Sequence, residues 1–267
     1  MSLLSVENVS VVFNKGKKSQ LTALNNVSFT LDKNEILGIV GESGCGKSTL
    51  ARTILQLQQA TSGKVNWKDS NIAEKNKKQQ KELRKQIQLV FQDPLDALNP
   101  RMTVAQIIAE PLHNLMPQLS KKVVHEKAVE MLLSMGLQQE QQNRYPHEFS
   151  GGQCQRIGIA RAMIVEPELL ICDEPVSALD VSIQAQIINL LLDLKQQTAM
   201  SMIFISHDLS VVRHVCDRVL VLYKGEVVEV ADAETLYINP QHPYTKKLLN
   251  AVPLADPVKE RQRIENG

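Results

Sequence analysis

Three stretches within the first 40 residues carry the hydrophobic patterns of β-strands. Residues 4–9 and 26–31 alternate apolar and polar positions, which is typical of strands with one buried face. Residues 36–40 are almost continuously apolar, which favours a strand that is buried on both faces. We therefore expect an N-terminal antiparallel β region next to a deeply buried strand.

The second half of the chain alternates apolar strands with amphipathic helices. Strand patterns occupy residues 169–172, 202–205 and 218–222, after an earlier one at 86–91. Helical periodicity follows in residues 182–197 and 211–216. This alternation is typical of a mostly parallel, buried sheet that is flanked by helices, and predicts an α/β fold.

The middle of the chain has a different character. From residue 94 to about 144 the pattern contains helices, at 104–113 and 122–135, and no clear strand. A Lys- and Gln-rich segment at 74–85 precedes it, with Leu83 as its main apolar residue, and predicts an exposed, partly helical surface. We divide the chain into a core of residues 1–93 and 162–267 and an inserted helical subdomain of residues 94–161.

Composition excludes several classes of function. The chain has 267 residues, of which 43% are hydrophobic, and its net charge is only +1, so no global positive field favours nucleic acid. No apolar run is long enough to span a bilayer, and the N-terminus lacks the pattern of a signal peptide. The four cysteines are scattered, which argues against a metal site or a disulfide framework. We expect a cytosolic protein whose membrane role, if any, comes through partners.

A glycine-rich loop between a strand and a helix is the strongest chemical signal. Residues 41–49 fit the pattern G-x-x-x-x-G-K-[ST] without a mismatch. The glycines allow backbone N–H groups to surround an anion, and the helix that follows directs its positive end at the same anion. Lys47 is expected to reach the β- and γ-phosphates of a nucleotide, and Ser48 to bind Mg²⁺. The predicted nucleotide-binding residues of this loop are Gly41, Glu42, Ser43, Gly44, Cys45, Gly46, Lys47, Ser48 and Thr49.

Two acids follow the apolar run at 169–172. A buried strand that ends in carboxylates beside a phosphate loop is where Mg²⁺ is held in phosphoryl-transfer enzymes. Asp173 is the predicted metal ligand, and Glu174 is predicted to orient or deprotonate the attacking water. An acidic turn before Pro175 is the alternative explanation of this pair.

A second glycine-rich helix start lies shortly before that strand. Ser150, Gly151, Gly152 and Gln153 precede a helix-compatible run, with Ser150 placed to cap the helix or contact phosphate. A chain with one nucleotide loop does not need a second one for itself. The simplest explanation is that this segment serves the nucleotide of a partner.

Together these residues resemble the ATP-binding subunits of ABC transporters over nearly the whole chain. Residues 41–49 resemble the Walker A loop of that family, 149–153 its signature motif, 169–173 its Walker B strand, and 177–180 its D-loop. Phe149 stands where Leu is usual, and Cys154 replaces a commoner basic residue. The resemblance implies a P-loop core, an antiparallel β subdomain, an inserted helical subdomain, and ATPase activity with ATP and Mg²⁺.

Several residues acquire a role only from this resemblance. A lone Gln is usually a surface residue, a His after a strand is usually structural, and a Phe is usually in the core. The resemblance instead makes Gln92 and His207 catalytic with Glu174 and Lys47, and assigns Phe13 to adenine stacking and Asp180 to nucleotide binding. It also gives Ser48, Gln92 and Asp173 as the metal-binding set.

Three further segments resemble the subfamily of peptide and nickel importers. They are residues 93–101, 180–186 and 239–245. Members of this subfamily often continue into a longer cysteine-bearing tail, and without those cysteines we expect no iron–sulfur cluster.

The resemblance also implies the partners and the place of work. We expect a head-to-tail dimer with a second ABC ATPase, as a heterodimer or, in isolation, a homodimer. Two transmembrane permease subunits, and indirectly an extracytoplasmic binding protein, complete the importer. The chain would then be peripheral to the cytoplasmic face of the inner membrane, with oligopeptides or dipeptides as cargo.

Three other functions remain open at this point. One is nickel import, which is mechanically the same. Another is a soluble ABC-type ATPase of DNA repair or translation, although such proteins usually carry coiled coils, zinc modules or two fused ATPase units. The third is a regulatory nucleotide-binding module without turnover, against which the presence of Glu174 and His207 argues.

Overall fold

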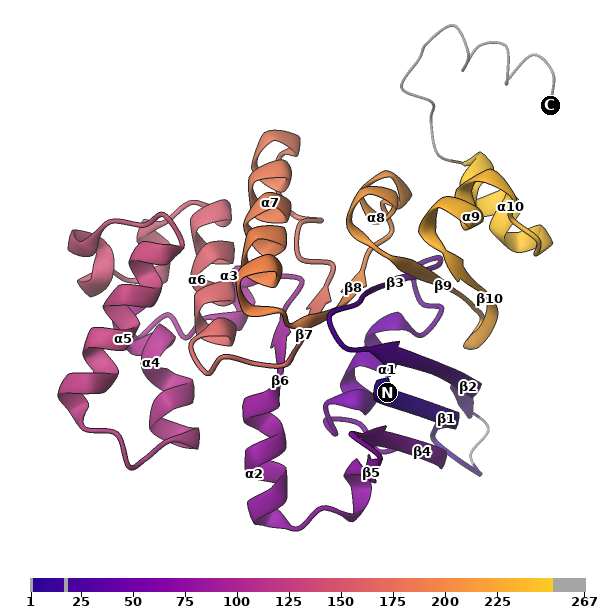
Figure 1. Cartoon of the computed structure of the whole chain (residues 1–267), viewed down its shortest axis with the longest axis horizontal. Helices are drawn as coiled ribbons and strands as arrows, with labels where there is room; N and C mark the ends of the chain where they lie inside the picture. Colours follow the sequence, from indigo (N-terminus) through magenta and orange to yellow (C-terminus); the bar gives the residue numbers. More distant parts are fainter. Residues whose placement is uncertain (1, 17–18, 252–267) are drawn as a thin grey trace, which may run out of the picture.

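The computed structural model describes residues 2–16 and 19–251, which form two β-sheets and a group of helices (Figure 1). The larger sheet has six strands in the order β10-β9-β3-β8-β7-β6. Its strands from β9 to β6 are parallel, and β10 pairs antiparallel with β9 at one edge. The strand bounds are β3 (Ile36–Val40), β6 (Ile87–Val90), β7 (Leu169–Asp173), β8 (Ser201–Ile205), β9 (Arg218–Tyr223) and β10 (Glu226–Asp232).

Both faces of this sheet are buried, as the apolar runs predict. Along β8, Met202 and Phe204 belong to one hydrophobic cluster, whereas Ile203 and Ile205 belong to another. Successive side chains of a strand point to opposite faces, so the two clusters are the two sides of the sheet. The prediction of a mostly parallel, buried sheet is confirmed.

The smaller sheet is antiparallel and has the order β2-β1-β4-β5. Its strands β1 and β2 are long, and Leu4, Leu24 and Leu31 on them belong to the hydrophobic cluster that also contains Leu37 of β3. The N-terminal β region is therefore packed against one face of the larger sheet. The bounds are β1 (Ser2–Phe13), β2 (Leu21–Asp32), β4 (Ser62–Trp67) and β5 (Ser70–Asn71).

The span between β6 and β7 contains only helices, which stand apart from the N-terminal sheet (Figure 1). Thr103 and Ser120 cap two of them through hydrogen bonds to backbone N–H groups. The helices are α3 (Pro94–Ala97), α4 (Val104–Leu115), α5 (Lys121–Ser134), the 3₁₀ turns η2 (Gln139–Asn143) and η3 (Pro146–Glu148), and α6 (Gly151–Met163). The division at residues 94 and 161 remains a prediction, and it would cut α6 two residues before its end.

The remaining helices lie outside this insertion. They are α1 (Lys47–Ile54), η1 (Ile72–Glu74), α2 (Lys77–Gln86), α7 (Val181–Thr198), α8 (Leu209–Val215), α9 (Ala233–Ile238) and α10 (Pro243–Asn250). As expected, α2 is exposed and buries only Leu83. The sequence patterns missed β4, β5, β10 and α9, and also the 3₁₀ turn η2, in which Gln141 is buried. No helix in the described ranges combines the length and apolarity that a bilayer span requires.

Candidate nucleotide site

The glycine-rich loop of residues 41–49, called the phosphate loop below, connects the end of β3 to the start of α1. Gly41 has a φ of +153°, and a Cβ atom there would lie 2.1 Å from the carbonyl oxygen of Leu222. Gly46 is the N-cap of α1 with a φ of 113°, a left-handed conformation that costs glycine little. The loop can therefore curl tightly against β9 and direct its backbone toward the start of α1.

Lys47 is held inside this loop. Its side chain is buried, and Nζ donates hydrogen bonds to the carbonyl oxygens of Gly41 at 2.8 Å and Glu42 at 3.1 Å. A buried ammonium needs such partners, because leaving water costs it solvation. The charge is thus already directed into the curve of the loop.

Ser48 and Asp173 meet although 125 positions separate them. Ser48 Oγ donates to Asp173 Oδ1 at 3.2 Å, which joins the first turn of α1 to the end of β7. Burial raises the pKa of Asp173, and Glu174 adds to this effect, while the hydrogen bond from Ser48 and the charges of Arg52 and Lys47 oppose it. A nearby cation would therefore stabilise the ionised form of Asp173.

Glu174 is the meeting point of the other predicted catalytic side chains. Its Oε2 accepts a hydrogen bond from Gln92 Nε2 at 3.2 Å, and Nδ1 of His207 lies 3.2 Å from the same oxygen. Gln92 follows β6, Glu174 follows β7 and His207 follows β8, so three parallel strands bring them to one edge of the sheet. Ligands of α/β folds bind at this edge.

A cavity of about 490 Å³ opens in front of the glycine-rich loop. Its lining includes Phe13, six residues of the glycine-rich loop and two of the predicted catalytic residues: Phe13, Ser43, Gly44, Gly46, Lys47, Ser48, Thr49, Gln92 and Glu174. The lining also includes residues that the sequence reasoning missed: Leu21, Thr22, Ala23, Lys224 and Gly225. No local pattern marks the latter, because β2 and the turn after β9 reach the cavity only through the tertiary fold.

The second glycine-rich segment does not line this cavity. Ser150 is the N-cap of α6 and accepts a hydrogen bond from the N–H of Gln153, so its predicted capping role is confirmed. Gly151 and Gly152 lie against Leu179 and Ile183, at the start of α7. Asp180 is the N-cap of α7 and is likewise absent from the cavity lining. Within this one chain, these residues and the phosphate loop form separate surfaces.

The cysteines and acids of the described residues form no metal centre of their own. All four cysteines are free and buried, and burial raises the pKa of Cys45, which keeps its thiol protonated. No three His, Cys, Asp or Glu side chains in the described ranges cluster closely enough to hold a metal.

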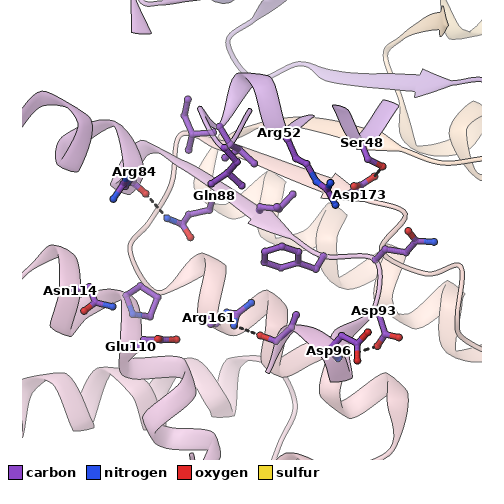
Figure 2. Close-up of a pocket in the computed structure, with 18 of the residues that line it drawn as sticks. Ser48, Arg52, Arg84, Gln88, Asp93, Asp96, Glu110, Asn114, Arg161 and Asp173 are labelled. Carbon is purple, nitrogen blue, oxygen red and sulfur yellow. Dashed lines mark hydrogen bonds between the residues drawn. The ribbon is translucent and has the colours of Figure 1, made fainter. Parts of the chain in front are cut away.

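A larger groove, of about 730 Å³, lies between the core and the helical insertion (Figure 2). Ser48 and Asp173 stand at one end of it and Asn114 at the other, as Figure 2 shows. Arg161 lines this groove. Its guanidinium donates a hydrogen bond to the carbonyl oxygen of Ala97 at 2.6 Å and lies over the Phe91 ring. Burial lowers the pKa of Arg161, an effect that the charge of Glu110 opposes. The groove is therefore continuous with the region of the catalytic residues.

Comparison with known families identifies the family of this chain. The family model described as "ABC transporter" matches residues 24–177, and "Oligopeptide/dipeptide transporter, C-terminal region" matches residues 228–267. This chain belongs to the ABC transporter family. The match includes the phosphate loop, the second glycine-rich segment and the two acids, and it identifies the chain as an ABC-type ATPase that binds ATP.

Close relatives are named for oligopeptide transport. The chain is 56% identical to the "Oligopeptide transport ATP-binding protein OppF" of Haemophilus influenzae, over 92% of this chain and 74% of that protein. It is 51% identical to the Bacillus subtilis protein of the same name, over 92% and 81%. The chain thus belongs with the peptide-importer ATPases of the ABC family, as the sequence motifs indicate.

Solved ABC cassettes have the same fold. CbiO1 of Clostridium perfringens, part of the transporter complex cbiONQ, superposes with a TM-score of 0.80 at 26% identity, over 98% of each chain. The ATP-binding cassette MJ0796, solved as a dimer bound to ADP and Pi, superposes with a TM-score of 0.77 at 29% identity, over 86% of this chain and 98% of that one. The predicted fold class is confirmed.

Proposed function

We propose that this chain hydrolyses ATP as one nucleotide-binding subunit of an oligopeptide importer. The observation that carries the proposal is the convergence of Gln92 and His207 on one oxygen of Glu174, next to the Ser48–Asp173 pair. A phosphate loop alone would only bind nucleotide. A carboxylate with two polar partners at the same sheet edge supplies a general base.

The phosphate loop binds and orients the nucleotide. Lys47 places its charge where the β- and γ-phosphates would lie, and the N–H groups at the start of α1 add donors. Phe13, at the end of β1, lies on the cavity rim with Leu21, opposite it in the strand register. We assign the adenine ring to this apolar end of the cavity.

The donor set fits Mg²⁺. Ser48 supplies a hydroxyl oxygen, Asp173 a carboxylate and Gln92 an amide oxygen, which are the hard ligands that Mg²⁺ takes. Two or three protein ligands suffice, because Mg²⁺ keeps waters and substrate phosphates as its other ligands, and this agrees with the small number of acids present. When bound, the ion would neutralise developing charge on the phosphates.

The base and its partners act on water. Glu174 accepts the proton of the attacking water, while His207 and Gln92 hold the carboxylate in position. The His207 side chain is 61% exposed and that of Glu174 only 17%, so His207 is accessible to an incoming group and Glu174 is shielded. We infer that this arrangement is completed by a partner.

The partner is a second ABC ATPase, bound head to tail. The segment from Ser150 to Gln153 lies outside the chain's own cavity, yet it has the form of an anion-binding helix start. A second protomer that faces the first would place this segment opposite a phosphate loop. The dimeric form of MJ0796 supports this assembly, and the full set of site residues in this chain is compatible with a heterodimer or a homodimer.

The groove of Figure 2 is the surface that we assign to a permease subunit. It lies between the helical insertion and the core, and its lining includes Gln92, which bonds Glu174. A permease segment that enters the groove would move Gln92 and so couple transport to hydrolysis. This assignment places the chain at the cytoplasmic face of the inner membrane, held through two permease subunits, with an extracytoplasmic binding protein acting indirectly.

Oligopeptides are the cargo that the relatives support. Both matched relatives carry that word in their names, and the C-terminal family model describes oligopeptide and dipeptide transporters. No residue of this chain needs to contact the cargo. Nickel, the other cargo of this subfamily, has no support among the reported relatives.

The central test is Glu174→Gln. The variant should bind ATP normally, form a stable ATP-dependent pair with its partner ATPase, and lose about 10²- to 10⁴-fold in turnover, the usual worth of a general base. Glu168→Gln, at the other end of β7, is the matched control, because Glu168 only pairs with Lys68 on the surface. Unchanged hydrolysis by Glu174→Gln would remove the proposed base.

A second experiment tests the partners. The tagged full chain, purified from membranes in mild detergent, should retain a second ATPase and two hydrophobic permease subunits. Import of labelled short peptides should stop when the chain is deleted and return with the wild-type gene but not with Glu174→Gln. Retention of nucleic acid or of a nickel-specific permease would overturn the assignment.

A further inference from the structure

A tyrosine from the C-terminal part of the chain contacts the phosphate loop. Tyr244 lies in the first turn of α10, and its hydroxyl oxygen accepts a hydrogen bond from the backbone N–H of Glu42 at 3.0 Å. The two residues are 202 positions apart. Tyr244 is buried, with 8% of its surface exposed. Burial also raises the pKa of Tyr244, so the hydroxyl stays protonated at neutral pH.

The bonded N–H belongs to a particular peptide unit. The N–H of Glu42 and the C=O of Gly41 are the two ends of one planar amide group, and in a trans peptide they point in opposite directions. That C=O accepts a hydrogen bond from Lys47 Nζ at 2.8 Å. Tyr244 therefore holds one end of the amide whose other end holds Lys47.

The tyrosine is itself firmly placed. Glu229 of β10 accepts the backbone N–H groups of Gln241 at 2.7 Å and His242 at 2.9 Å. His242 caps α10 through Nδ1, which accepts the N–H of Tyr244 at 3.2 Å, and Pro243 fixes the first helical residue. These contacts attach the start of α10 to the edge strand of the larger sheet.

The neighbouring turn reinforces the same contact. The ring of Tyr223, at the end of β9, packs on that of Tyr244 with centroids 4.0 Å apart. Two residues later the N–H of Gly225 donates to the carbonyl oxygen of Cys45 at 2.9 Å. The phosphate loop is thus supported from outside by two segments of the last 45 residues, neither of which carries a phosphate-binding motif.

We propose that Tyr244 is a positioning residue of the nucleotide site, which orients the Gly41–Glu42 peptide so that Lys47 is presented to the phosphates. The start of α10 is then part of the ATP-binding machinery. The inference rests on the proposed function of the phosphate loop. It makes ATP affinity depend on a helix outside the phosphate-binding motifs.

The test is Tyr244→Phe in the full chain. The change keeps the ring and its contact with Tyr223, and removes only the acceptor of the Glu42 N–H. The KM for ATP and the Kd of a fluorescent ATP analogue should rise about 3- to 10-fold, the effect of one hydrogen bond, while kcat stays within about twofold. A purely structural role would lower the unfolding temperature without this separation of KM from kcat.

Tyr237→Phe is the matched control. The Tyr237 hydroxyl also bonds to the backbone, but it donates to the carbonyl oxygen of Leu209, and Tyr237 does not line the cavity. This variant should keep the ATP affinity of the wild type. If Tyr244→Phe and Tyr237→Phe have the same KM, the inference is overturned while the ATPase assignment stands. If the wild type binds no ATP, the proposed function itself fails.

Hydrogen exchange offers a readout that needs no turnover. In the nucleotide-free chain, the amide of Glu42 should exchange faster in Tyr244→Phe than in Tyr237→Phe, because its acceptor is lost. If Tyr244→Phe proves too unstable to purify, Glu229→Gln replaces it, since weakening the anchor of α10 should raise the exchange rate in the same loop. Unchanged exchange at Glu42 in the variant used would contradict the proposal.

Discussion

Two glycine-rich segments in this chain begin helices, and their surroundings differ sharply. The phosphate loop before α1 is enclosed, with Lys47 buried and bonded to Gly41 and Glu42. The segment before α6 begins with an exposed serine that caps its own helix, and its glycines lie against Leu179 and Ile183 near the start of α7. Both have the backbone form of an anion site, but only the first has a cavity with acids beside it within the same chain.

The comparison teaches what one chain can complete by itself. The phosphate loop brings together groups from β1, β6, β7 and the turn after β9, so a nucleotide can bind to a single protomer. The segment before α6 does not line this cavity. In the proposed dimer a second protomer would bring a phosphate to it, so that ATP would hold the two protomers together.

Lys47→Ala breaks the first side of the comparison and has the largest expected effect on ATP binding. It removes the charge that the loop carbonyls hold in place, and hydrogen bonds to a charged group are worth about 2–3 kcal/mol, or roughly 30- to 150-fold in affinity. Isothermal titration with an ATP analogue measures the change. Lys122→Ala is the control, because the side chain of Lys122 is 85% exposed on α5. Retained affinity in Lys47→Ala would show that the loop does not bind the phosphates.

Ser150→Ala tests the other side and should have a smaller effect. ATP affinity of the single chain should stay within about twofold, because Ser150 does not line its cavity. With the partner ATPase present, turnover should fall about tenfold, the worth of one hydrogen bond to a charged phosphate. A fall in the affinity of the single chain would contradict the two-chain site.

Ser120→Ala separates this effect from the loss of a helix cap. Ser120 caps α5 as Ser150 caps α6, because the side chain of each serine accepts a hydrogen bond from the N–H three residues later. Each substitution should cost about 1 kcal/mol of stability by denaturant unfolding. Only Ser150→Ala should reduce turnover, and an equal reduction in both would make the effect merely structural.

Glu229→Gln tests how the start of α10, which supports the phosphate loop, is held in place, and it has the smallest expected effect. Burial alone would raise the pKa of Glu229, but the Thr245 hydroxyl, the N–H groups of Gln241 and His242 and the charge of His242 together lower it below its ordinary value. A depressed carboxyl pKa stabilises the fold at pH values above the unfolded pKa, and this stability is lost as the pH falls through the folded pKa. The free energy of unfolding of the wild type should exceed that of the variant by under about 1 kcal/mol at pH 7, and the two should converge as the pH falls through the folded pKa.

Chemical unfolding at several pH values measures this difference. Glu226→Gln, on the same strand β10, is the control, because Glu226 bonds the side chain of Asn25 and not the start of α10. A difference between Glu229→Gln and the wild type that does not change with pH would show that the charge of Glu229 is not what holds α10.

The sequence motifs predicted the phosphate loop, both acids and the main strands because each depends on local order. Period-two alternation reveals β1 and β2, and a loop between an apolar strand and a helix reveals residues 41–49. The strands β10 and β4 were missed, since their burial comes from neighbours that the pattern does not specify. Gln92 and His207 were found only through the family resemblance, because a single polar residue after a strand carries no pattern of its own.

Local order along the chain therefore determined that this protein has a nucleotide loop, a pair of acids and a second glycine-rich helix start. Only the tertiary structure decided which of these share a cavity, because parallel strands far apart in sequence end at one sheet edge and bring Gln92, Glu174 and His207 together. It also decided that Tyr244 supports the loop from 202 residues away, a contact that arises where α10 packs against the end of β9. Hydrophobic periodicity specifies the elements, whereas the burial of both sheet faces fixes how they meet.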